Sequence, residues 1–240
     1  MLHINGEGTE FRKLNEMIRQ SAHDIAVDGL IGQRFIAAGL SGKRVELTGT
    51  PGNALGAYLN GAEITVYGNA QDAVGDTMNA GSIVIHGNIG DAAGYAMRGG
   101  EIYVEKNAGY RAGIHMKEYV DKCPVMVIGG RCGSFLGEYQ AGGVIVVLGL
   151  NIGDKDIVSN FPCTGMHGGK MYLRSDCSNI IFPYNVNVTR ADAEDLKEIE
   201  IYVTKYCRYF EKDKADIMNA VFTKVVPDSK NPYKQMYVAN

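Results

Sequence analysis

The 240-residue sequence has no tryptophan, few prolines and no surplus of positive charge. Its 24 Lys and Arg residues stand against 27 Asp and Glu residues, which gives a formal net charge of -3. Nucleic acids and anionic membranes bind through clustered cations, so this balance favours neither partner. No apolar run approaches the ~18 residues that span a bilayer, and the N-terminus does not resemble a signal peptide. We therefore expect a cytoplasmic protein whose partners are small molecules or proteins.

Cysteine is also sparse, and its spacing argues against the common cysteine sites. The chain has five cysteines, an odd number, and none of them forms the C-x-x-C pair typical of zinc sites and redox dithiols. We predict buried free thiols at Cys123, Cys132, Cys163, Cys177 and Cys207.

Glycine, in contrast, is abundant, with 31 residues in a chain that is still 45% hydrophobic. Such a chain is too apolar to be a disordered linker. Glycine at this density is typical of turns with positive φ and of close approaches between backbone segments. Its spacing should therefore be tested for a repeat.

The sequence repeats every 19 residues from Val45 to Met116. Each unit contains two apolar positions separated by one residue, which is the alternation of a short strand with one buried face. The first position holds Val45, Ile64, Ile83 and Ile102, and the second holds Leu47, Val66, Ile85 and Val104. The residues between them are Glu46, Thr65, Val84 and Tyr103.

Two turns complete each unit. An asparagine follows each strand, at Asn69, Asn88 and Asn107. Glycine precedes the first two, whereas Lys106 precedes Asn107 and the basic Arg111 lies nearby in the sequence. A second glycine is followed three residues later by an apolar side chain, which we expect to lie in the core. The glycines are Gly56, Gly75, Gly94 and Gly113, and the apolar residues are Leu59, Met78, Met97 and Met116.

A unit with one strand cannot bury its own apolar face and must stack on its neighbours. At ~4.8 Å between coils, equivalent residues form ladders along the axis. We predict an all-β core, a right-handed parallel β-helix of ~19-residue coils over residues 41–188. Residues 1–40 form an N-terminal helix and lead-in, and residues 189–240 form a helical extension and tail. An outward loop is predicted from Asn151 to Phe161.

Apolar residues recur at helical spacing in both flanks. A helix beginning after an N-cap at Thr9 is expected to cover the open end of the solenoid, with Phe11, Leu14, Met17 and Ile18 on one face. A second helix starts near Ala191, with Leu196, Ile199, Val203, Tyr206 and Phe210 on one face. A third starts near Asp213, and residues 223–240 are interpreted as an extended tail that docks on the same or another subunit.

These residues resemble the glycine-repeat third domain of glutamate synthase, which also occurs as a separate polypeptide in archaeal and some bacterial forms of that enzyme. The resemblance rests on Gly56–Asn88, Gly137–Gly149, Asn160–Leu173 and the C-terminal VFTKVVP, Val221–Pro227. The same β-helix unit occurs in one subunit of formylmethanofuran dehydrogenase, and the repeat alone does not separate the two. The helical extension favours glutamate synthase.

The resemblance implies a structural role in an enzyme that moves ammonia from glutamine onto 2-oxoglutarate. Its partners would be a glutaminase subunit, a class II amidotransferase with an N-terminal cysteine, and a synthase subunit that holds FMN and a 3Fe-4S cluster. Here Leu2 follows Met1, and Cys123, Cys132 and Cys163 lack the compact spacing of the family's cluster-binding run. We expect no catalytic, cofactor-binding or metal-binding residue in this chain and no activity of the chain alone. Homo-oligomerisation stays open.

Other features favour structural interpretations over metal sites. His86 and His115 fall in neighbouring coils but in different columns, and a catalytic zinc site needs about three protein ligands. Asp72 and Asp91 share one column, where two solvated corner carboxylates fit better than a calcium site. The remaining histidines are His3, His23 and His167.

Two alternative functions are set aside by spacing. The segments Gly87–Gly94 and Ser41–Arg44 lack the residue order and the following helix of a phosphate-binding loop. A hexapeptide-repeat acyltransferase needs an aliphatic residue at every sixth position, but from Ile64 these positions are Ala70, Asp76 and Ser82. A subunit of glutamate synthase, a subunit of a formylmethanofuran dehydrogenase-like enzyme and a stand-alone binding scaffold remain.

Overall fold

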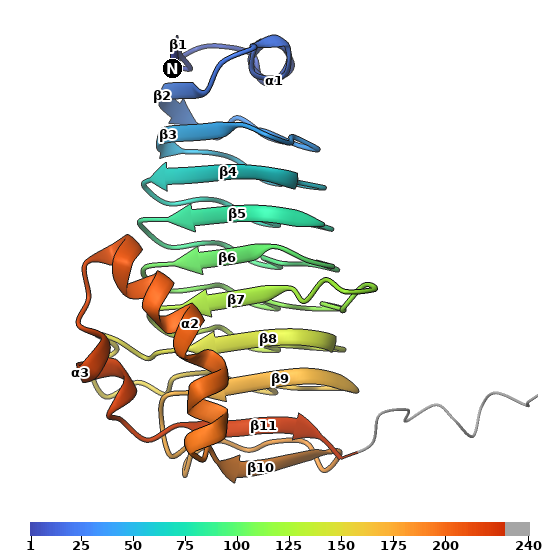
Figure 1. The fold of residues 1–240 in the computed structure, drawn as a ribbon, viewed down its shortest axis with the longest axis vertical. Helices are drawn as coiled ribbons and strands as arrows, with labels where there is room; N and C mark the ends of the chain where they lie inside the picture. The colour runs from blue at the N-terminus through green and yellow to red at the C-terminus, as the bar shows by residue number, and fades with distance from the viewer. Residues whose placement is uncertain (229–240) are drawn as a thin grey trace, which may run out of the picture.

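In the computed structural model, which describes residues 1–228, the chain winds into a β-solenoid of about eight turns (Figure 1). The predicted solenoid is thus confirmed. Within these residues one 11-stranded sheet has the order β1-β2-β3-β4-β5-β6-β7-β8-β9-β11-β10. The strands are β1 (Leu2–Asn5), β2 (Ile25–Ile31), β3 (Arg44–Thr50), β4 (Asn60–Tyr67), β5 (Ala80–Ile85), β6 (Glu101–Val104), β7 (Val125–Ile128), β8 (Ala141–Val147), β9 (Gly168–Leu173), β10 (Val186–Arg190) and β11 (Thr223–Pro227). The helices are α1 (Phe11–Gln20), α2 (Ala193–Phe210) and α3 (Lys214–Met218).

The strand register follows the 19-residue repeat. Val45 pairs with Ile64, Ile64 with Ile83, and Ile83 with Ile102, and all four are at most 1% exposed. The methionine column is also confirmed as core, because Met78, Met97 and Met116 are fully buried. Stacking in register therefore fills the solenoid axis with these two apolar columns.

Two later coils are longer, and their extra residues form loops. Ile102 pairs with Met126, and Ile145 pairs with Met171, so each of these coils exceeds the repeat length. The predicted outward loop from Asn151 to Phe161 is only partly correct. Ile157 and Val158 are 3% and 2% exposed, because Val158 pairs with Cys132 and returns the chain to the coil.

The turns between strands have an alternating backbone that the repeat did not reveal. Gly56, Gly75 and Gly94 have φ of 63°, 68° and 67°, as expected for their column. The residues two positions before and after each glycine are also left-handed, for example Ala54 at 64° and Tyr58 at 57°. Ala54 and Tyr58 donate their N–H groups to the following coil, and Gly56 donates its N–H to the preceding one. These bonds hold the non-glycine residues in a conformation they seldom adopt.

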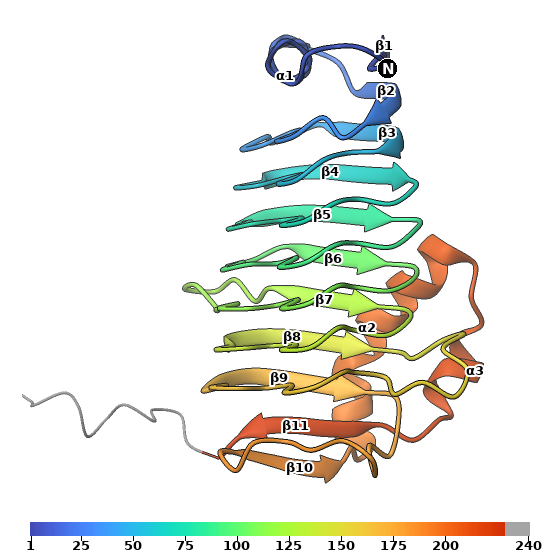
Figure 2. The ribbon, with the colours of Figure 1, turned by 180° about the vertical axis from the view of Figure 1, so that it is seen from behind.

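The N-terminal helix α1 lies at one end of the stack, and α2 and α3 lie beside the other end (Figure 2). Its N-cap is Glu10, whose side chain accepts from the backbone of Arg12 and Lys13, so the predicted cap at Thr9 is wrong. Thr9 instead donates its hydroxyl to the carbonyl of Asn5.

The sheet begins before residue 41, because β1 pairs with β2 and β2 with β3, and it also includes β11 from the C-terminal extension.

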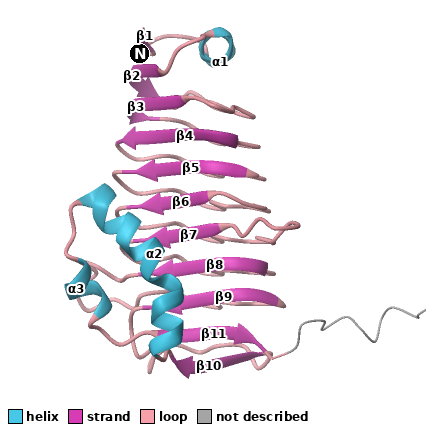
Figure 3. Ribbon diagram, viewed as in Figure 1, coloured by secondary structure: helices cyan, strands magenta, loops and turns pink. Residues whose placement is uncertain are grey.

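Helix α2 covers the outer face of the middle and later strands (Figure 3). Its predicted apolar face is confirmed, since Ile199, Val203, Tyr206 and Phe210 are buried. The outward residue of the repeat changes from Glu46 and Thr65 to apolar residues from β5 onward, and the helix packs on that apolar set. The set comprises Val84, Tyr103, Val127, Val146 and Tyr172.

The C-terminal end reverses the direction of the sheet. Strand β11 lies antiparallel between β9 and β10, so part of the predicted extended tail is a strand of the sheet. Residues 229–240, and with them the predicted docking of the tail, lie outside the described residues. No helix of residues 1–228 is long and apolar enough to cross a membrane.

Candidate functional site

A hollow with charged walls, here called the charged cleft, lies where the loop before β7 meets the starts of β8 and β9. Its volume is about 660 Å³. Helix α2 and the end of β11 complete the wall. The side chains that bear chemistry are Glu118, Cys123, His167, Lys170 and Glu198.

The ionic groups of the charged cleft bind one another. The Nζ of Lys170 lies 2.6 Å from Oε2 of Glu198, and the hydroxyl of Tyr172 donates to the same oxygen at 3.1 Å. The hydroxyl of Tyr172 also lies 3.4 Å from Asp195, which pairs with Lys224 on β11. This network joins β9, α2 and β11, so its first effect is to fix the helix on the sheet.

The prediction of buried thiols is confirmed at four cysteines and wrong at Cys123, which is exposed because it lies in the loop before β7. The thiol of Cys123 is not an activated nucleophile. Partial burial of the thiol group raises its pKa, and the negative charges of Glu118 and Glu198 raise it further, while the positive charge of Lys170 opposes them. A thiol with a raised pKa is protonated at neutral pH, whereas nucleophilic attack needs the thiolate. His167 places Nδ1 at 3.0 Å from the carbonyl of Gly165, within its own turn.

The glycines of the charged cleft serve the packing of coils. A Cβ on Gly142 would lie 2.5 Å from the backbone nitrogen of Glu118, and one on Gly169 would lie 2.5 Å from Nε2 of Gln140. The space beside each of these glycines is thus already occupied by atoms of the protein. They therefore do not form a cradle for an anion.

Gln140 is a core residue that the sequence interpretation missed. It follows Gly137 by three positions, as Met116 follows Gly113, and is fully buried. Its Nε2 donates to the carbonyls of Gly142 and Gly143, both at 3.2 Å. Extending the methionine column by one coil would have found it.

Asparagine side chains connect successive coils along one corner. The Oδ1 of Asn69 accepts the backbone N–H of Asn88 at 2.8 Å, and Oδ1 of Asn88 accepts that of Asn107 at 3.2 Å. The ladder ends where Asn107 accepts the backbone N–H of Arg131 at 2.9 Å. The predicted asparagine column is thus a chain of hydrogen bonds that ties each strand end to the next.

The column of Asp72 and Asp91 forms a second ladder of the same kind. Oδ1 of Asp72 accepts the backbone N–H of Asp91 at 2.9 Å, and Oδ1 of Asp91 accepts that of Tyr110 at 2.8 Å. Each carboxylate therefore has a structural partner in the next coil. Within residues 1–228 no three His, Cys, Asp or Glu side chains are grouped to hold a metal ion.

The two histidines of neighbouring coils lie in separate aromatic clusters. The ring of His86 stacks on Tyr67 and meets the edge of Phe210, with ring centres 5.0 Å apart in both contacts. The ring of His115 stacks on Tyr139 at 5.1 Å. The structure therefore does not bring the two histidines to one site.

The glycine- and lysine-containing segments set aside from phosphate binding have structural contacts. Gly94, at the end of the segment that starts at Gly87, lies in a turn with a φ of 67° and precedes strand β6. Nζ of Lys43 lies 3.1 Å and 3.0 Å from the carbonyls of Ile18 and Arg19. The cation thereby binds the C-terminal end of α1, where the helix dipole favours positive charge.

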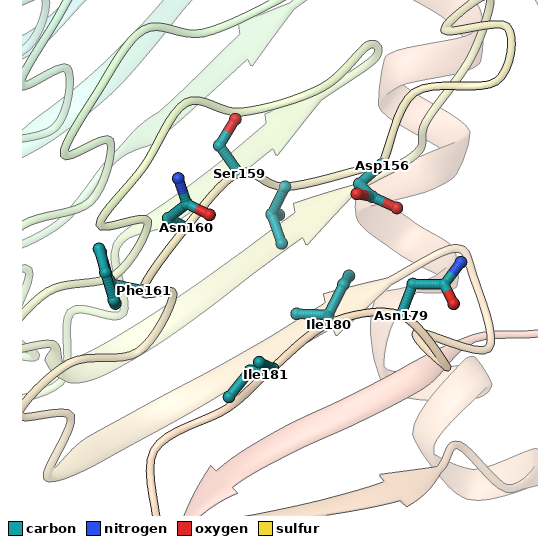
Figure 4. Close-up of a pocket in the computed structure, with 8 residues that line it drawn as sticks. Asp156, Ser159, Asn160, Phe161, Asn179, Ile180 and Ile181 are labelled. Atoms are coloured by element: carbon teal, nitrogen blue, oxygen red, sulfur yellow. The ribbon is translucent and has the colours of Figure 1, made fainter.

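A second hollow, here called the terminal slot, lies at the C-terminal end of the solenoid and has a volume of about 190 Å³. Figure 4 shows its two walls, the segment 156–161 of the last coil and the segment 179–181. Asp156, Ser159 and Asn160 bring polar atoms to it, and Phe161 and Ile181 bring apolar surface. No motif in the sequence indicated this slot, because it forms where the repeat stops.

Comparison with known proteins finds similarity along nearly the whole chain. The family model described as GXGXG motif matches residues 12–230. An uncharacterised protein of Methanocaldococcus jannaschii is 40% identical over 248 aligned residues, covering 98% of this chain and 95% of the relative. The chain therefore matches its relative along almost its full length.

Proposed function

Because the chain belongs to the GXGXG motif family, the glycine-repeat domain of glutamate synthase, we propose that it is a non-catalytic assembly subunit of a glutamate synthase in the cytoplasm. The family match over residues 12–230 is the observation that carries this proposal. The complete enzyme transfers ammonia from glutamine to 2-oxoglutarate. This subunit spaces the glutaminase module and the FMN-binding synthase module.

The geometry of the solenoid supports a spacing role. About eight turns at ~4.8 Å per coil give a column on the order of 40 Å long, comparable to a small domain. The asparagine and aspartate ladders connect the coils along the column, and α2 bridges several strands. Such an element holds two modules at a fixed separation and offers long flat sides for their interfaces.

The placement of the cysteines supports assigning the iron–sulfur cluster to a partner subunit. Such clusters are bound by thiolates gathered around the metal. Here burial raises the pKa of Cys132 and Cys163, and Cys207 lies on α2 while Cys123 lies in the loop before β7. We assign FMN and the iron–sulfur cluster to the synthase partner.

Reconstitution tests the proposal. The chain is co-expressed with the glutaminase and synthase subunits encoded by the same organism, and flavin, iron and subunit stoichiometry are measured on the complex and on the isolated chain. We expect a colourless isolated chain and a complex that contains flavin and iron. Omitting the chain should reduce glutamate formation from glutamine while leaving formation from added ammonia nearly unchanged, because separation of the modules impairs transfer between them.

Two other results would contradict the proposal. Recovery with molybdopterin-type subunits assigns the chain to a formylmethanofuran dehydrogenase-like enzyme. Recovery as a lone homo-oligomer, with no binding to either glutamate synthase subunit, means that the family gives the fold while the function is that of a separate binding scaffold.

A further inference from the structure

In each coil from Ala70 to Tyr139, three backbone N–H groups donate to the next coil at its turn-rich side. In the penultimate coil the donors are Cys132, Phe135 and Tyr139. Two carbonyls of the same stretch, those of Cys132 and Leu136, accept N–H groups from the next coil. The three donations go to Ile157 at 3.0 Å, Asn160 at 2.9 Å and Thr164 at 2.8 Å, and the two acceptances come from Ser159 at 3.1 Å and Cys163 at 2.8 Å.

The last coil presents the same groups toward the segment 179–181, which forms the facing wall of the terminal slot and makes no backbone hydrogen bond to them. The residues equivalent to the three donors are Val158, Phe161 and Gly165, and the equivalent carbonyls belong to Val158 and Pro162. None of these five groups has a backbone partner within the described part of the chain. Such a row of donors and acceptors is a template for another polypeptide segment.

Neighbouring parts of the solenoid ends are closed by the chain itself. Strand β11 covers the edge of β9, and Nδ2 of Asn185 donates to the carbonyl of Met166 at 2.9 Å. At the N-terminal end, Asn15 of α1 donates to the carbonyl of Arg34 at 3.0 Å and accepts from the N–H of Ala37 at 3.2 Å. The open row along the terminal slot therefore contrasts with ends that are capped elsewhere.

Apolar side chains flank the open row. Phe161 is 61% exposed and Ile181 is 88% exposed, and they lie on opposite walls of the terminal slot (Figure 4). Large apolar side chains at this exposure, beside unpaired backbone groups, are typical of a protein-binding site.

We infer that the terminal slot binds an extended backbone segment of a partner subunit, which continues the solenoid by one rung. The hydrogen bonds between the last two coils define what the occupant must offer. In the last coil the accepting carbonyls are three and four residues apart along the chain, and the two donating N–H groups are four residues apart. The segment must present the same order of carbonyl and N–H groups. The inference rests on the proposed function, which makes the partner a subunit of the same enzyme complex.

A second copy of this chain is a poorer occupant. Head-to-tail stacking of two copies requires an open first coil, and α1 with its Asn15 contacts covers that coil. A heterologous contact of this kind would also continue into a filament. A partner segment ends the stack instead.

Hydrogen exchange and charge substitution test the inference on the assembled complex. Exchange at the amides of Val158, Phe161 and Gly165 should be at least tenfold slower in the complex than in the isolated chain. The double variant Phe161→Asp/Ile181→Asp should weaken partner binding at least tenfold in a titration with the purified subunits. The control Ile31→Asp/Val120→Asp alters residues 75% and 88% exposed outside the slot and should bind as the wild type does.

The outcomes separate this inference from the proposed function. A complex that forms without slower exchange at the three amides overturns the inference alone, and this measurement involves no variant that could fail to fold. Undiminished binding by a folded double variant does the same. Protection of the amides in a dimer of the isolated chain assigns the slot to a second copy and also overturns it. A wild-type chain that binds neither subunit overturns the proposed function and the inference together.

Discussion

Oδ1 of Asn69 accepts two hydrogen bonds from Asn88 of the next coil, one from the backbone N–H at 2.8 Å and one from Nδ2 at 3.1 Å. Asn88 in turn accepts both bonds from Asn107. Each inner asparagine is therefore donor and acceptor at once. No other common side chain has this pair of groups at this length.

Replacing the middle asparagine should destabilise the stack. Asn88→Ala removes its two roles and leaves the backbone N–H of Asn107 without its acceptor, so we expect the free energy of unfolding to fall by about 1–3 kcal/mol. Denaturant unfolding measures the change. The matched control is Asp72→Asn, because Asp72 is only an acceptor in its ladder and asparagine keeps that oxygen. An Asn88→Ala variant as stable as the control would contradict the ladder.

The glycine column separates two costs that usually occur together. Gly75 and Gly39 have almost the same φ, 68° and 67°, but a Cβ on Gly75 would lie 2.6 Å from Cδ1 of Ile102 while nothing lies within 4 Å of one on Gly39. Gly39→Ala should cost about 1 kcal/mol from the left-handed backbone alone. Gly75→Ala should cost about 1–3 kcal/mol more from overpacking, and Gly75→Val more again. Equal melting temperatures for the two alanine variants would show that the coils separate to admit the methyl group.

The anchoring of α2 predicts a dependence on pH. Burial opposes ionisation of Asp195, but the hydrogen bond and charge of Lys224 outweigh it and lower the pKa below its ordinary value of 3.8. Asp195 therefore adds stability that is fully present above that value and is lost as the pH falls through the lower folded-state pKa. Asp195→Asn should reduce stability at neutral pH and flatten its decline in acid. Unfolding titrations from pH 6 to pH 2 measure both, and parallel curves for variant and wild type would contradict this assignment.

One hydrogen bond joins α2 to the strand end of β6. The hydroxyl of Tyr206 donates to the carbonyl of Glu105 at 3.0 Å, and burial raises its pKa and keeps it protonated. Tyr206→Phe should therefore lower the free energy of unfolding by about 1 kcal/mol. Tyr58→Phe, at a residue 58% exposed, serves as control and should change stability by less than about 0.5 kcal/mol. A larger loss in the control than at Tyr206 would contradict this role.

The repeat made the core predictable, because a period of 19 residues leaves only stacking in register to bury its apolar columns. The change of the outward residue from Thr65 to Val84 was also visible and marks where α2 begins to cover the sheet. The left-handed backbone of Ala54 could not be found, since alanine carries no local preference for it and long-range hydrogen bonds impose it.

The sites were harder to predict than the core. Glu10 caps α1 in place of Thr9, because the carboxylate of Glu10 accepts the free N–H groups of the first helical turn. The terminal slot lies where the repeat stops, and a repeat pattern predicts only the coils that follow it. The charged cleft joins residues from four elements, which no spacing rule connects.

The position of β11 between β9 and β10 sets an order of events during synthesis. Strands β1 to β9 can stack as they leave the ribosome, because each pairs with the one before it. Strand β10 has no partner other than β11 among the described strands, so it stays unpaired until some thirty further residues have been translated. The same end of the molecule that carries the terminal slot is thus the last to form.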